Sequence, residues 1–208
     1  IILFRFIQNT FDKIITSIFW RYARFQFKAS KIKFGSNLMV KGLVLIDIHQ
    51  NSNVIIGDNC TIKSGFGTNP LSRNIKCSIT AENNAKIQIG HNVGISSSCI
   101  WAHDSITIGS NVNIGADSII IDSDAHSLNF EERRNHIVDQ EQKNNIPIII
   151  GDDVFIGTRC IILKGVNIGA RSIVGSGSVI VQDIEPNSIY AGNPVSYTHL
   201  TLPTKVRV

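Results

Sequence analysis

Residues 148–180 read IIIGDDVFIGTRCIILKGVNIGARSIVGSGSVI, and a branched aliphatic residue recurs in this stretch every six positions. The recurring residues are Ile150, Ile156, Ile162, Ile168, Val174 and Ile180. Four of them are followed directly by glycine. The fourth residue after each of the first five is small or branched, at Val154, Cys160, Val166, Ser172 and Ser178. A period of six fits neither an amphipathic helix nor an ordinary β-hairpin.

The same design occurs earlier in the chain, in pairs of isoleucines six residues apart. The pairs are Ile56 and Ile62, Ile89 and Ile95, and Ile108 and Ile114, with inward companions at Cys60, Val93, Cys99, Val112 and Ser118. We interpret the pattern as a coil of three short strands joined by tight corners, where glycine permits positive φ and close approach. One coil cannot bury its apolar face alone, so coils must stack. The sequence therefore predicts an all-β fold, a parallel β-helix of about seven coils of about 18 residues each.

The composition of the 208 residues, 43% hydrophobic and 17% charged, is typical of one folded domain. The net charge of +4 is unevenly placed, since residues 1–33 carry seven Lys or Arg against Asp12, leaving −2 for the remainder. No basic stripe interleaved with aromatic residues runs through the body, so we expect no nucleic-acid partner. The four cysteines form no C-x-x-C pair, and we expect them to be reduced core residues of a cytoplasmic protein.

Residues 1–34 differ from the repeats and are predicted to form an amphipathic helical segment. Apolar residues at three- and four-residue steps share one helix face: Phe4, Ile7, Phe11, Ile14, Ile15, Ile18, Tyr22 and Phe25. Arg5, Asp12 and Lys13 interrupt any run long enough to span a bilayer. Two interpretations remain open. The helix either docks on the body or on a neighbouring subunit, or it makes a peripheral membrane contact through residues 1–30.

The repeats, together with IIIDSDAHSLN at 119–129 and AGNP at 191–194, resemble the hexapeptide-repeat acyltransferases over residues 35–194. Within that family the chain is most similar to sugar O-acetyltransferases of the galactoside, maltose and surface-polysaccharide type. The resemblance implies a left-handed winding of the β-helix, assembly as a homotrimer and acetyl-CoA as co-substrate. Some relatives of this fold bind zinc through three histidines, but the close-spaced histidine pair of those relatives is absent here, so we expect no metal.

The period stops at residues 122–146, DSDAHSLNFEERRNHIVDQEQKNNI, which we expect to leave the coil as a long loop. His126 lies near its start. An imidazole that titrates near neutrality can accept the proton of an acceptor hydroxyl and return it to a departing thiolate. A carboxylate on the other ring nitrogen would fix the tautomer, and Asp122 and Asp124 are the local candidates. The resemblance implies the same base, whereas spacing alone leaves a solvated loop histidine open.

The resemblance also implies where the two substrates bind. Acetyl-CoA would lie along the C-terminal coils, at Gly157, Thr158, Gly175 and Ser176, although these glycines are equally explained as corner residues. The family's usual cations after the G-N-P step are missing, and Lys164, Arg159 and Arg171 are the candidates to compensate for them. The positions aligned with sugar contacts are Ser96 and Asp104; Asp104 is equally explained as a turn residue.

Family character ends at Pro194, and we expect residues 195–208 to be a non-native tail. The sequence thus predicts a cytoplasmic O-acetyltransferase that acts on a sugar hydroxyl of a surface polysaccharide or its precursor. Alternatives are an amino sugar or a serine as acceptor, or a catalytically inactive β-helical scaffold.

Overall fold

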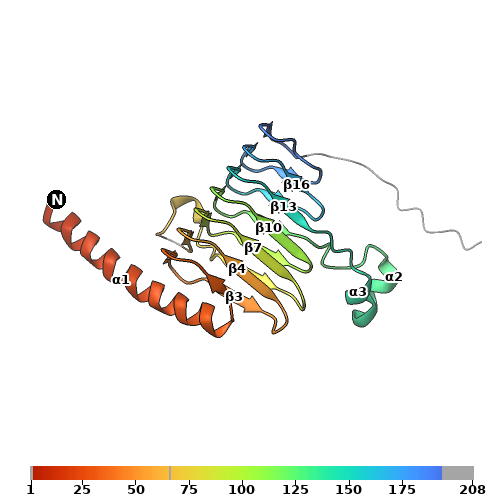
Figure 1. Ribbon diagram of the computed structural model, residues 1–208, viewed down its shortest axis with the longest axis horizontal. Coiled ribbons are helices and arrows are strands. Elements are labelled where there is room, and N and C mark those ends of the chain that lie inside the picture. Colours follow the sequence, from red (N-terminus) through yellow and green to blue (C-terminus); the bar gives the residue numbers. More distant parts are fainter. Residues whose placement is uncertain (1, 66, 194–208) are drawn as a thin grey trace, which may run out of the picture.

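The computed structural model describes residues 2–65 and 67–193, and their backbone winds into a three-sided prism (Figure 1). Every pairing between strands is parallel, as expected for stacked coils. Six complete coils and the start of a seventh are present. The predicted left-handed parallel β-helix is confirmed.

The three faces of the prism are sheets A, B and C, named in the order in which each coil visits them. Sheet A comprises β1 (Lys33–Phe34), β4 (Asn53–Ile56), β7 (Lys86–Ile89), β10 (Ser105–Ile108), β13 (Ile148–Ile150) and β16 (Asn167–Ile168). Sheet B comprises β2 (Met39–Lys41), β5 (Thr61–Lys63), β8 (Gly94–Ser96), β11 (Asn113–Ile114), β14 (Phe155–Ile156), β17 (Ile173–Val174) and β19 (Ile189–Tyr190). Sheet C comprises β3 (Leu45–Ile48), β6 (Ser78–Ala81), β9 (Cys99–Ala102), β12 (Ile119–Ile121), β15 (Ile161–Ile162) and β18 (Val179–Ile180).

The period of six arises because each side of a coil contributes one anchor residue, at an equivalent place, that points into the prism. The anchors from Ile150 to Ile180 are all at most 1% exposed, and Ile156 stacks on Val174 in register. Most corner companions are buried as well, but Cys99 lies on the outer face of sheet C, paired with Ser78 and Ile119. The inward position at that corner is filled by Ser98, which is fully buried. The expectation for Cys99 was therefore wrong by one residue.

The corner glycines are required by close approach between coils. A Cβ on Gly151 would lie 2.7 Å from the backbone nitrogen of Ala170 in the next coil. Positive φ falls two residues later, at Asp153 (φ 58°). An aspartate tolerates this conformation better than most residues do. At this corner, Gly151 allows the close approach and Asp153 adopts the positive φ, whereas we had expected glycine to do both.

The helix α1 (Ile2–Ala29) covers the N-terminal end of the prism, and its N-terminal half extends beyond the coils (Figure 1). Ala23 and Phe27 are buried against the first coil, where Phe27 meets Phe34 edge to face at 5.9 Å. The indole of Trp20 donates a hydrogen bond to the carbonyl of Leu38. The coils begin at Lys33 rather than at residue 35, because β1 pairs with β4.

Two segments leave the coils. Residues 64–65 and 67–77, which the sequence pattern did not predict as a loop, protrude between sheets B and C. They carry the 3₁₀ helix η1 (Pro70–Ser72) and include Arg73, which forms an ion pair with Asp117. The predicted loop 122–146 protrudes between sheets C and A. It carries α2 (Phe130–Arg133) and α3 (His136–Gln142), and Ser123 and Asn145 bridge at its base. The loop 122–146 therefore has a defined structure of its own, with two short helices and a bridge at its base.

Candidate functional site

The loop 122–146 holds His126 against a buried carboxylate. The Nδ1 atom of His126 lies 2.7 Å from Oδ2 of Asp139, whose side chain is 5% exposed, while the imidazole itself is 66% exposed. Asn135 caps α3, and this helix carries Asp139 in its first turn. The other carboxylate oxygen accepts the backbone N–H of Ser127 at 2.8 Å. Asp139 therefore fixes both the ring of His126 and the chain that follows it.

The pairing determines which nitrogen of His126 can act as a base. The hydrogen bond with His126, followed by the Ser127 N–H, lowers the pKa of Asp139 below its ordinary value. The carboxylate is thus ionised at neutral pH and accepts a proton-bearing Nδ1. A neutral imidazole held in this way presents the lone pair of Nε2 to solvent.

His91 is a useful contrast because it also contacts an aspartate. Its Nδ1 lies 3.2 Å from Oδ2 of Asp58, but that atom also lies 3.0 Å from the backbone nitrogen of Asp58, which donates to it. Nδ1 of the neutral ring is then an acceptor, and Nε2 must carry the proton. Two His–Asp pairs in one chain thus favour opposite tautomers, and only that of His126 suits a base.

The structure places the two expected partners of His126 elsewhere. Asp122 is fully buried and accepts the backbone N–H groups of His103 (2.7 Å) and Asp104 (2.9 Å), so it caps the corner of the preceding coil. Asp124 forms an ion pair with Lys164, with Nζ 3.1 Å from Oδ1. The carboxylate that contacts His126 is that of Asp139, not that of Asp122 or Asp124. Thirteen positions separate it from His126, and no local spacing in the sequence links the two.

The residues expected to contact acetyl-CoA lie together on the edge between sheets B and C. A Cβ on Gly157 would lie 2.6 Å from the backbone nitrogen of Ser176, and one on Gly175 would lie 2.9 Å from Cβ of Ala191. The hydroxyl of Thr158 donates to the carbonyl of Ala116 at 2.5 Å. We call Gly157, Thr158, Gly175 and Ser176 the donor edge. Lys164 is not part of it, because its amine is held by Asp124 at the base of the loop.

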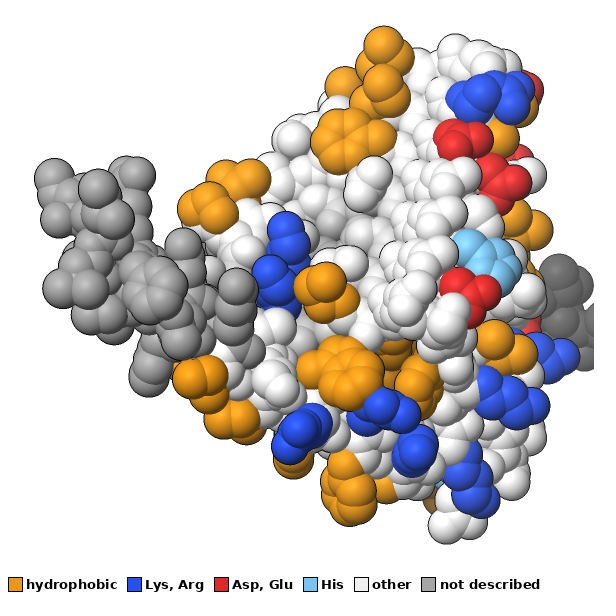
Figure 2. Space-filling view, turned by 60° about the vertical axis from the view of Figure 1, so that its left-hand side comes forward, with side chains coloured by type: hydrophobic (Ala, Val, Ile, Leu, Met, Phe, Trp, Pro, Cys, Tyr) orange, Lys and Arg blue, Asp and Glu red, His pale blue; other side chains and the backbone are white. Residues whose placement is uncertain are grey.

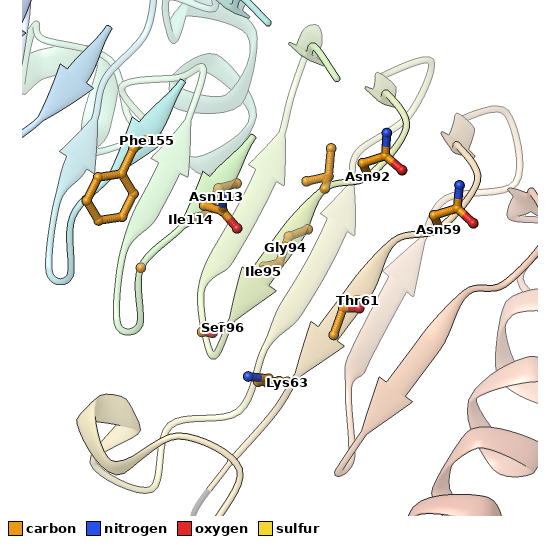
Figure 3. A pocket seen from close by; sticks show the side chains of 12 residues that line it. Asn59, Thr61, Lys63, Asn92, Gly94, Ile95, Ser96, Asn113, Ile114 and Phe155 are labelled. Atoms are coloured by element: carbon orange, nitrogen blue, oxygen red, sulfur yellow. The ribbon is translucent and has the colours of Figure 1, made fainter. Parts of the chain in front are cut away.

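The two expected acceptor contacts are separated within one chain. Ser96 lines a shallow groove of about 570 Å³ on the outer face of sheet B (Figure 3). Asn59 and Asn92 stand along one side of this groove, Lys63 and Ser96 along the other, and Phe155 at one end (Figure 3). Asp104 is exposed at the corner between sheets C and A, on the same edge as the loop of His126.

The candidate residues thus fall on two edges of the prism. His126, Asp139 and Asp104 lie on the edge between sheets C and A, and the donor edge lies between sheets B and C. Within residues 2–65 and 67–193, no three His, Cys, Asp or Glu side chains form a group that could hold a metal ion. Over the same ranges, no helix has the length and hydropathy needed to cross a bilayer.

Comparison with known proteins shows which proteins this chain is similar to. Residues 105–123 and 147–182 match the family model described as the hexapeptide repeat of succinyl-transferase. The galactoside O-acetyltransferase of Escherichia coli is 35% identical over 111 residues, which cover 53% of this chain and 52% of that enzyme. The tetrahydropyridine-dicarboxylate N-acetyltransferase of Clostridium perfringens is 46% identical over 54 residues, covering 26% of this chain and 23% of that enzyme. The chain spans about half, or less, of the length of the curated relatives it matches.

A solved structure has the same fold. The hexapeptide-repeat acetyltransferase of Vibrio cholerae, crystallised with acetyl-CoA, superposes with a TM-score of 0.52 at 24% identity, over 83% of this chain and 73% of that one. The repeats, the parallel three-sided prism and the relatives agree. In its repeats and in its fold, the chain is similar to the hexapeptide-repeat acetyltransferases.

Proposed function

We propose that this chain transfers the acetyl group of acetyl-CoA to a sugar hydroxyl, with His126 as the general base. The observation that carries the proposal is the contact of His126 with buried Asp139: a neutral imidazole that donates its Nδ1 proton to this carboxylate has its lone pair on Nε2, and the side chain is 66% exposed. Acetyl-CoA as donor is supported by the relatives: the matched curated enzymes are acetyltransferases, and the V. cholerae structure holds acetyl-CoA.

The proposed reaction is a direct transfer. Nε2 of His126 takes the acceptor's hydroxyl proton while the oxygen attacks the thioester carbonyl carbon. Backbone amides stabilise the tetrahedral oxyanion, and its collapse breaks the C–S bond. The departing thiolate takes the proton back from the imidazolium, which Asp139 stabilises meanwhile. Each proton and electron pair is accounted for without a covalent enzyme intermediate.

The proposed site forms between two copies of the chain, in a homotrimer. Within one chain the donor edge and the edge that carries His126 are separated by the width of sheet C. A cyclic trimer would bring the donor edge of one copy against the His126 edge of the next. Ser96 and Asp104 would then contact the acceptor from different copies. The small residues of the donor edge leave the backbone open to an extended pantetheine arm.

The acceptor that we propose is a sugar of a surface polysaccharide or its precursor. Similarity to the galactoside enzyme supports a sugar hydroxyl as the acceptor, whereas similarity to the N-acetyltransferase supports an amino group as the alternative acceptor. A thiol-release assay with acetyl-CoA decides between them, using a panel of sugars, amino sugars and serine. Release with none of the acceptors would favour a β-helical scaffold without catalysis.

Substitutions at the histidine pairs test the base. We expect His126→Ala to lower turnover by at least about 10²-fold, and Asp139→Asn by at least about tenfold because the carboxylate no longer holds the tautomer. His91→Ala is the matched control: it also removes a histidine paired with an aspartate, but from the edge between sheets A and B. Near-normal turnover of His126→Ala would remove this residue from the mechanism.

A further inference from the structure

The helix α1 has two apolar faces, and the β-helix covers one of them. The covered face carries Ala23 and Phe27, with Trp20 packed beside them. On the opposite face, Ile14, Ile18, Tyr22 and Phe25 are between 48 and 71% exposed. Their spacing of three and four residues forms a continuous row, which we call the outer stripe. The outer stripe is part of the apolar helix face that the sequence predicted, but the face that packs on the coils is the one with Ala23 and Phe27.

Cations border the outer stripe on both sides. Arg21 and Lys28 are exposed along one side of it on the helix. Along the other side, beyond Ile15 and Phe19, a groove of about 460 Å³ separates α1 from the coils, and Lys41 and Lys76 line it. Figure 2 shows hydrophobic and basic side chains lying next to one another on this face of the molecule.

We propose that the outer stripe docks on the surface of an anionic phospholipid bilayer, with α1 lying in the plane of the interface. An apolar row bordered by Lys and Arg matches an acyl boundary covered by anionic headgroups. The charge of +6 over residues 1–33 favours this partner. It disfavours a second copy of the same helix, because pairing two such segments would bring like charges together. The N-terminal half of α1 extends beyond the coils (Figure 1).

Co-sedimentation of the full chain with lipid vesicles tests the proposal. We expect binding to vesicles of mixed phosphatidylglycerol and phosphatidylcholine and much weaker binding to phosphatidylcholine alone. The double variant Ile18→Ser, Phe25→Ser should bind at least about tenfold more weakly, since two apolar side chains no longer enter the interface. Arg21→Gln with Lys28→Gln should lose about fivefold per cation at low salt and little at high salt.

The control is Ile189→Ser in β19, at the opposite end of the prism. Ile189 is 78% exposed, so its change removes exposed apolar surface at a site away from α1, and binding should stay at the wild-type level. Binding of the Ile18, Phe25 variant at the wild-type level would overturn the proposal, as would equal binding to the two kinds of vesicle. Light scattering tests the alternative that a second copy of the chain covers the outer stripe. A lower oligomeric mass for the Ile18, Phe25 variant than for the wild type would show such a contact, and the proposal would fail.

Discussion

The imidazole of His103 lies in an environment that opposes its protonation. Its ring packs against that of Trp101 at an interplanar angle of 36°, with centroids 4.9 Å apart, and in the described part of the chain neither ring nitrogen has a hydrogen-bond partner. Burial lowers the pKa of His103, and nearby Lys143 adds to the effect, against smaller opposing contributions from Glu82 and Asp122. The folded state therefore holds this histidine neutral over a range in which an unfolded chain would protonate it.

The protein should lose stability as the pH falls below about 6.5, the ordinary pKa of histidine. Below that value the unfolded chain takes up a proton at position 103 that the folded chain refuses, so the free energy of unfolding decreases until the folded pKa is reached. His103→Phe keeps a ring against Trp101 and removes the titration. We expect its melting temperature to fall less than that of the wild type between pH 7.5 and pH 5.5. Equal falls would show that His103 is not a source of the acid sensitivity.

At the scale of the element, α1 provides two phenylalanines that differ in burial. Phe27 is fully buried against the first coil, whereas Phe25 is 71% exposed. Phe27→Ala should lower the free energy of unfolding by about 3–5 kcal/mol, because it leaves a cavity at the end of the prism. Phe25→Ala should change it by less than about 0.5 kcal/mol. Urea unfolding of both variants measures the difference, and similar values would mean that α1 does not cover the core.

These elements also show how far the sequence could predict the fold. The coils were predictable because every turn repeats one packing problem, so the solution recurs at Ile150, Ile156 and Ile162. The docked face of α1 was not. Trp20, Ala23 and Phe27 recur at helical spacing just as Ile18, Tyr22 and Phe25 do, and contacts with Phe34 and Leu38 make the choice.

The candidate site divides in the same way. His126 could be singled out as the proposed base because its chemistry, its place at the break in the period and the family resemblance coincide. Asp139 could not, because the turn of the chain that joins it to His126 depends on how α2 and α3 pack within the loop. The expectation for Asp122 was wrong because its carboxylate accepts two backbone N–H groups of the neighbouring coil, and nothing in the local sequence around His126 indicates those contacts.

At the scale of the whole molecule, the donor edge and the edge that carries His126 lie apart on one chain, and this separation leads to a prediction about mixtures of variants. If catalysis needs the His126 edge of one copy and the donor edge of the next, then variants damaged on different edges should complement each other. His126→Ala removes the base. Ser176→Trp places a bulky ring on the donor edge, at an exposed residue where folding should be preserved.

Each variant alone should be inactive in the thiol-release assay, yet unfolding and refolding them together in equal amounts should restore activity. Three quarters of randomly assembled trimers would contain both variants, and each of those would have one intact site of three, giving about a quarter of the wild-type rate. Refolding each variant by itself is the control for recovery of the fold. Continued inactivity of the mixture, with mixed trimers demonstrated by a tag on one variant, would place both substrates on one chain, because only a site shared between copies can be rebuilt by exchanging copies.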